Sequence, residues 1–147
     1  MPARQTALPG PASRILLVDD NANGLSARRC VLEELGHRIT TASSASEALE
    51  QLGSHNFDLL VTDYKMPRMD GIELIARVRK HEPNIPVILL SGFVDALGLS
   101  ENNTGADVVI QKSANEVSHL VRSVGRLLRK KKPNGSEGRG KARRKSV

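Results

Sequence analysis

The sequence predicts an α/β protein built on a doubly wound, five-stranded parallel sheet. Short and almost wholly apolar runs alternate along the chain with longer segments whose apolar residues recur every three or four positions. Runs of the first kind are typical of strands buried on both faces, and segments of the second kind are typical of helices that cover a sheet. Because parallel strands are joined by right-handed crossovers, helices on both faces of one open sheet are the simplest arrangement.

The predicted strands are short, and polar residues follow most of them. The second strand is the weakest, because it relies on Ile39 and on the β-branched Thr40 and Thr41. The predicted strands span residues 14–18, 37–42, 57–62, 86–90 and 107–111.

A helix is predicted after each strand. Ser44 and Glu47 predict a capping box at the start of the second helix, and Ser113 and Glu116 predict another before the last. The fourth helix is weakly encoded because Gly98 interrupts it, so we expect it to be short and mobile. The predicted helices lie at about residues 23–35, 44–52, 71–81, 95–102 and 113–129.

The charge of the chain is unevenly distributed. The net charge is +6, but residues 126–147 hold ten of the 22 basic residues and one acid, which leaves about −3 for the rest. The basic character therefore belongs to the end of the chain and not to the folded body. We predict a disordered leader at residues 1–13, one domain at 14–129 and a basic, disordered tail at 130–147.

Two absences narrow the class of protein. Cys30 is the single cysteine, which excludes an intrachain disulfide and a cysteine-based metal site. No apolar run approaches the roughly 18 residues of a membrane-spanning helix, and the first residues lack the apolar segment of a secretory signal. We therefore expect a soluble, cytoplasmic protein with no membrane partner.

The candidate functional residues all follow predicted strands. Asp19 and Asp20 come after the first strand, Asp63 after the third, Ser91 after the fourth and Lys112 after the fifth. The carboxyl ends of parallel strands meet at one edge of a sheet, where ligands of such folds bind. Converging carboxylates repel one another unless a cation neutralises them, so the sequence predicts a magnesium site at this edge.

The same set of side chains suggests phosphoryl transfer. That reaction depends mainly on positioning and on neutralising charge, which a cation, a lysine and a hydroxyl around one carboxylate provide. Asp63 would then be the nucleophile and would form an aspartyl phosphate.

These motifs carry a family resemblance over about residues 14–129. They are residues 16–21 (LLVDDN), residues 60–71 (LVTDYKMPRMDG), Ser91-Gly92, residues 105–107 (GAD) and Lys112. With them the chain resembles the receiver domain of two-component response regulators, of the stand-alone, single-domain type. The resemblance implies a flavodoxin-like (βα)5 fold with strand order 2-1-3-4-5.

The resemblance also implies roles for individual residues. Asp63 would accept a phosphoryl group from a sensor histidine kinase or a phosphotransfer protein, Ser91 would donate its hydroxyl to that group, and Lys112 would pair with one of its oxygens. Magnesium would be ligated by Asp20, Asp63 and the backbone carbonyl of Lys65, and Asp19 would hold the ion through water. A phosphoacceptor of this kind is not an enzyme in the usual sense, although it can catalyse its own phosphorylation and dephosphorylation.

Some residues depart from the family pattern. Receivers usually carry Tyr or Phe three residues before the lysine, as a rotameric switch, and this chain has Val109 there. Phe93 is a possible substitute, and Ser113 follows Lys112 where the family usually has proline. We therefore expect the phosphorylation chemistry to be intact and the output to be atypical.

Three alternative functions remain open. A receiver that no longer switches could act as a protein-binding scaffold or a phosphate sink. A phosphatase of the haloacid dehalogenase type has less support, since the Asp-x-Asp motif of that family is absent after the first strand. The basic tail could contact nucleic acid or an acidic downstream protein, but it has no aromatic residue and no recognisable DNA-binding fold.

Overall fold

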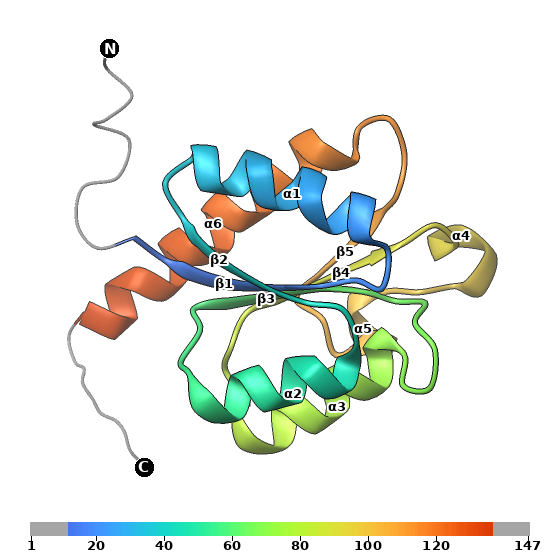
Figure 1. The fold of residues 1–147 in the computed structure, drawn as a ribbon, viewed down its shortest axis with the longest axis horizontal. Coiled ribbons are helices and arrows are strands. Elements are labelled where there is room, and N and C mark those ends of the chain that lie inside the picture. The colour runs from blue at the N-terminus through green and yellow to red at the C-terminus, as the bar shows by residue number, and fades with distance from the viewer. Residues whose placement is uncertain (1–11, 137–147) are drawn as a thin grey trace.

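The computed structural model describes residues 12–136, and these form one five-stranded parallel sheet with helices on both faces (Figure 1). The strand order is β2-β1-β3-β4-β5, which confirms the predicted doubly wound topology. The first eleven residues of the predicted leader and residues 137–147 of the predicted tail lie outside the described residues.

The elements follow the predicted order, except that two short helices take the place of the fourth. The strands are β1 (Arg14–Val18), β2 (Arg38–Ala42), β3 (Leu59–Asp63), β4 (Val87–Ser91) and β5 (Val108–Gln111). The helices are α1 (Ala22–Glu34), α2 (Ala45–Ser54), α3 (Gly71–His81), α4 (Val94–Leu97), α5 (Glu101–Thr104) and α6 (Glu116–Ser136).

The sheet separates two hydrophobic cores. Figure 1 shows α1 and α6 on one face and α2 and α3 on the other. Successive residues of β1 alternate between the cores, since Ile15 and Leu17 pack under α1 and α6 while Leu16 and Val18 pack against α2 and α3. Fully burying one such side chain contributes about 1.5–3 kcal/mol. Because the strands are buried on both faces, their sequences are continuous apolar runs.

The register of the sheet brings the strand ends to one edge. Val18 lies opposite Thr62, Asp63 lies opposite Leu90, and Ser91 lies opposite Gln111. The residue that follows each strand is therefore placed beside its counterparts at the carboxyl edge. The fold thus does what the sequence predicts and gathers the polar strand ends.

Of the two predicted capping boxes, the one at α2 forms in half and the one at α6 does not form. Ser44 Oγ accepts a hydrogen bond from the Glu47 N–H at 3.1 Å, although the Glu47 carboxylate accepts from Ser43 and not from the cap residue itself. At the start of α6 the predicted box does not form. Ser113 Oγ accepts from the Asn115 N–H, and Glu116 turns its carboxylate toward α1.

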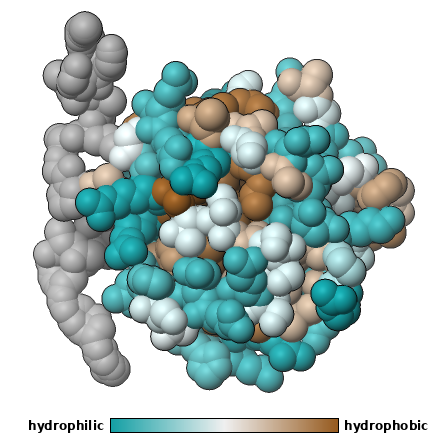
Figure 2. Space-filling model, in the orientation of Figure 1, coloured by the Kyte–Doolittle hydropathy of each residue, from teal (hydrophilic) through white to brown (hydrophobic). Residues whose placement is uncertain are grey.

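The region between β4 and β5 is irregular, as Gly98 predicts. Gly98 adopts the left-handed conformation with φ of 64° and ends α4 after four residues. A second helix of four residues, α5, then begins after Ser100 and ends at Gly105, which is also left-handed. Phe93 and Leu97 are 50% and 52% exposed, and Figure 2 shows a hydrophobic area at the right-hand edge of this view, where Figure 1 places α4.

The last helix is longer than predicted. α6 extends to Ser136 and so includes the first part of the range for which the sequence predicts a disordered tail. Within the described residues, no helix is long and apolar enough to cross a membrane.

Gly71 fixes the approach of α3 to the end of β3. Its N–H donates to the Tyr64 carbonyl at 2.8 Å. A Cβ at this position would collide with the Asp63 carbonyl oxygen and lie 2.9 Å from Leu89 Cδ1. Only glycine lets the helix start this close to the strand that carries Asp63.

We therefore expect Gly71→Ala to destabilise the protein by about 1–3 kcal/mol, because the added methyl group must push α3 away from β3. Urea unfolding followed by far-ultraviolet circular dichroism measures the change. Gly53→Ala is the matched control, since a Cβ there meets nothing within 4 Å inside α2, and we expect it to be neutral or stabilising by up to about 1 kcal/mol. Equal effects of the two substitutions would contradict this account of Gly71.

Candidate functional site

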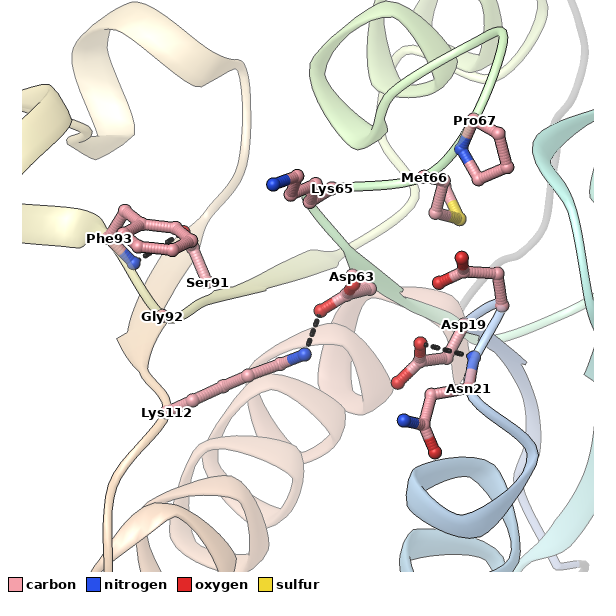
Figure 3. A pocket seen from close by; sticks show the side chains of 11 residues that line it. Asp19, Asn21, Asp63, Lys65, Met66, Pro67, Ser91, Gly92, Phe93 and Lys112 are labelled. Atoms are coloured by element: carbon pink, nitrogen blue, oxygen red, sulfur yellow. Dashed lines mark hydrogen bonds and ion pairs between the residues drawn. The ribbon is translucent and has the colours of Figure 1, made fainter.

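The strand ends enclose a pocket with a volume of about 630 Å³ at the carboxyl edge of the sheet. Figure 3 shows Lys112 reaching toward Asp63 from one side, while Asp19 and Asn21 lie on the other. Every site residue that the sequence predicts lies on this pocket. Its lining residues are Asp19, Asp20, Asn21, Asp63, Lys65, Met66, Pro67, Ser91, Gly92, Phe93 and Lys112.

Asp63 is the last residue of β3, and its side chain is buried at the base of the pocket. The Lys112 ammonium forms an ion pair with Asp63 Oδ1, and within the described residues this oxygen has no other hydrogen-bond partner. Burial raises the pKa of Asp63, the hydrogen bond from Lys112 opposes that effect, and the charge of Asp19 adds to it. The site thus holds an incompletely satisfied carboxylate.

Three carboxylates meet in the pocket. Oxygen atoms of Asp19, Asp20 and Asp63 all lie within 4.8 Å of one another, with Asp20 exposed and the other two buried. Hard oxygen ligands in this arrangement fit a divalent cation such as magnesium, which commonly takes one or two carboxylates and keeps several waters. The donor set therefore suits the predicted metal.

Asp19 is held by contacts that the sequence analysis did not predict. Its Oδ1 accepts from the Asn21 N–H at 2.9 Å, and its Oδ2 accepts from Arg28 Nη1 at 2.7 Å. Arg28 Nε in turn donates to Glu116 Oε2 at 2.6 Å. Burial alone would lower the pKa of Arg28, but the bonds to Glu116 and Asp19 outweigh it and raise that pKa. The sequence gives one sign of this contact, because Arg28 is a charged residue on the apolar side of the first predicted helix.

Ser91 ends β4 and is buried next to the pocket. Its Oγ accepts a hydrogen bond from the Phe93 N–H at 3.0 Å, so the hydroxyl proton can be donated to a ligand. The Ser91 carbonyl accepts from the Lys112 N–H at 2.8 Å, which joins the ends of β4 and β5. A Cβ at the neighbouring Gly92 would meet nothing within 4 Å, so the pocket stays open there.

The Lys65 side chain points across the pocket mouth. Its ammonium lies 5.8 Å from the centre of the Phe93 ring, a cation–π distance. The role predicted for Lys65, ligation of magnesium through its backbone carbonyl, does not involve this side chain and stays a prediction.

Val109 occupies the position where receivers usually carry the aromatic switch residue. Val109 is half-buried, packs against the core under α2 and α3, and donates its N–H to Glu101 at 3.2 Å. Gln111, at the end of β5, makes two contacts that the sequence analysis did not predict. Its side-chain amide donates to the Gly92 carbonyl at 2.8 Å and accepts from the Val94 N–H at 3.0 Å. The start of α4 is therefore tied to β5 directly beside the pocket.

Comparison with known proteins identifies the family. A family model described as the response regulator receiver domain matches residues 15–124. The chain belongs to this family. Its members are phosphoacceptors of two-component signalling.

Individual relatives show how far the similarity extends. The response regulator receiver protein CpdR of Brucella abortus is 29% identical over 115 residues, which cover 78% of this chain and 96% of CpdR. The gliding motility regulatory protein of Myxococcus xanthus is much longer, and the chain spans 15% of it at 31% identity. Other curated relatives are also at least twice as long as the part they share with this chain.

Solved structures agree with the fold. TrrA, a response regulator protein from Thermotoga maritima solved in complex with Mg(2+)-BeF, has a TM-score of 0.70 and 34% identity, with 78% of this chain and 98% of TrrA covered. TrrA in complex with the histidine kinase ThkA gives a TM-score of 0.71, covering 79% of this chain and 98% of that one.

Because the pKa of Asp63 is raised, the stability of the protein in magnesium-free buffer should depend on the ionisation of this residue. The pKa of this carboxyl is higher in the native protein than in the unfolded chain. Between these two pKa values the native protein binds more protons, so the free energy of unfolding falls as pH rises through this range. We expect Asp63→Asn to be more stable than the wild type at pH 7. The gain should shrink as pH falls and vanish below the ordinary value of 3.8.

Urea unfolding of both proteins from pH 3 to pH 8 checks this difference. Titrating groups that do not interact with Asp63 are common to both proteins and cancel, whereas Asp19 and Lys112 contribute to the difference because they act on Asp63. An asparagine variant that is less stable than the wild type at pH 7 would show that the Lys112 ion pair outweighs burial.

Proposed function

We propose that this receiver takes a phosphoryl group onto Asp63 from a histidine kinase or a phosphotransfer protein, with magnesium in the acidic pocket. The observation that carries the proposal is the placement of a buried carboxylate beside an ammonium, a hydroxyl and two further carboxylates in one pocket. The kinase partner is supported by the solved complex of TrrA with the histidine kinase ThkA.

Each residue of the pocket has a defined task in this proposal. A carboxylate oxygen of Asp63 forms a bond to phosphorus while the bond between phosphorus and the donor nitrogen breaks, and the electron pair leaves with that nitrogen. Lys112 then pairs with a phosphoryl oxygen instead of with Asp63, and the Ser91 hydroxyl donates to another. Both groups already lie at the pocket, so the transfer requires little rearrangement.

The cation would be held by Asp20 and Asp63 directly, by the Lys65 carbonyl, and by Asp19 through water. When bound it neutralises charge that accumulates on the phosphoryl oxygens. The engagement of both Asp19 oxygens by Asn21 and Arg28 supports the water-mediated role for Asp19.

The output of the site would run through α4 and not through Val109. Ser91 contacts both the pocket and the Phe93 N–H, and Gln111 ties the next residues to β5. A change in the hydrogen bonds of Ser91 therefore acts directly on the short helices α4 and α5. The second candidate function, a scaffold or phosphate sink that does not switch, is favoured by the absence of an aromatic side chain at Val109.

Phosphorylation at Asp63 is testable with a small phosphoryl donor in the presence of magnesium. We expect an acid-stable but hydroxylamine-sensitive label on the wild type and none on Asp63→Asn, because the amide cannot act as the nucleophile. Chelating the magnesium should reduce labelling strongly. Asp70→Asn is the matched control, since Asp70 caps α3 from the same loop and asparagine caps equally well. Equal labelling of wild type and Asp63→Asn would overturn the proposal.

Switching is distinguished from a scaffold role by nuclear magnetic resonance. On addition of magnesium and beryllofluoride we expect amide signals to move in residues 93–104, which the contacts of Ser91 and Gln111 connect to the pocket. A non-switching scaffold would change only the signals of residues next to Asp63. Asp63→Asn provides the baseline, since it should respond in neither region.

A further inference from the structure

Arg28 is a buried charge inside the domain. It lies on the core-facing side of α1 and is 8% exposed, while the neighbouring Arg29 is on the surface and pairs with Glu33. Taking a guanidinium out of water is costly unless its donors are paired. The structure pairs them with two carboxylates from distant segments, Asp19 at 2.7 Å and Glu116 at 2.6 Å.

The contact with Asp19 places a positive charge next to the acidic pocket. Asp19 already uses one oxygen for the Asn21 N–H, so the bond to Arg28 occupies the other. Within the described residues, two cations accompany the three carboxylates of the pocket: Lys112 pairs with Asp63 inside the pocket, and Arg28 pairs with Asp19 from behind its lining. A divalent cation that enters the pocket has to act against both of these positive charges.

The chain leaves space for this ion pair. Gly24 lies one turn before Arg28 on α1, and a Cβ at Gly24 would be 3.1 Å from Asp19 Oδ2 and 3.2 Å from Arg28 Nη1. A larger residue would crowd both partners of the bond. Glu116 fixes Arg28 from the opposite side, and it does so as the first residue of α6, four positions after Lys112.

We propose that Arg28, anchored by Glu116, is a positioning residue that holds Asp19 as a counter-ion and thereby weakens magnesium binding to the pocket. This inference rests on the proposed magnesium site. In it, Glu116 sets how strongly Arg28 acts on Asp19, because a guanidinium that is neutralised by Glu116 competes less with the metal. The first residue of α6 and the acidic pocket are therefore linked through one side chain.

Two substitutions should change magnesium affinity in opposite directions. Arg28→Met removes the competing charge and keeps much of the side-chain volume, so we expect magnesium to bind about tenfold more tightly. Glu116→Gln leaves the charge of Arg28 to Asp19 alone, so we expect binding to weaken several-fold. Arg29→Met, one position along the same helix, is the control for an equal change in net charge and should have little effect.

Isothermal titration of the purified 147-residue chain and of each variant with magnesium chloride measures the dissociation constants, and circular dichroism checks the fold. A merely structural role for Arg28 predicts the opposite sign, since a displaced Asp19 would bind the metal less well. Unchanged or weaker binding by Arg28→Met, or tighter binding by Glu116→Gln, would overturn the inference. If Arg28→Met does not fold, Arg28→Gln replaces it in the titration, since glutamine also removes the charge but can still donate a hydrogen bond to Asp19, and the same tighter binding is expected.

The same titration separates the inference from the proposed function. A wild type that binds no magnesium would refute the metal site itself. A wild type that binds magnesium, with Arg28→Met equal to it, would refute only the role of Arg28.

Discussion

The organisation of the site depends on keeping the carboxylate of Asp63 buried next to two other acids. Like charges at this spacing are unfavourable in a poorly solvated environment, and the protein compensates them from opposite sides. Lys112 comes from the end of β5 and neutralises Asp63, whereas Arg28 comes from α1 and neutralises Asp19. In the proposed function, the negative charge that remains would hold the divalent cation next to the Asp63 oxygen that accepts the phosphoryl group.

The sequence contains enough information for the sheet and for most of the pocket. A parallel sheet brings its carboxyl ends to one edge whatever its details, so the residues after each apolar run had to meet. Contacts between distant segments could not be predicted in this way. The ion pair of Arg28 with Glu116 joins positions 88 apart, and it also removes Glu116 from the capping box that local spacing predicts. A local pattern therefore predicts the local hydrogen bond wrongly where pairing a buried charge stabilises the protein more, as Arg28 does here with Glu116.

The structure also suggests how a receiver can do without an aromatic side chain at Val109. Two segments next to the pocket are tied to it by polar contacts. One is the start of α4, held by Ser91 and Gln111, and the other is the start of α6, held by Glu116 through Arg28. In the proposed function, these hydrogen bonds would change with the charge in the pocket, and no ring would have to move. Among the described helices, α4 and α5 have the fewest buried side chains, none in α4 and one in α5, and so offer the least resistance to such a change.

In the proposed function Asp63, among the acids of the pocket, forms the bond to phosphorus. After incubation with a phosphorylated histidine kinase and magnesium, reduction with borohydride converts an aspartyl phosphate into homoserine at the residue that carried it. Peptide mass spectrometry then locates that residue. We expect homoserine at position 63 and unmodified aspartate at positions 19 and 20. Homoserine at either of those positions, with position 63 intact, would contradict it.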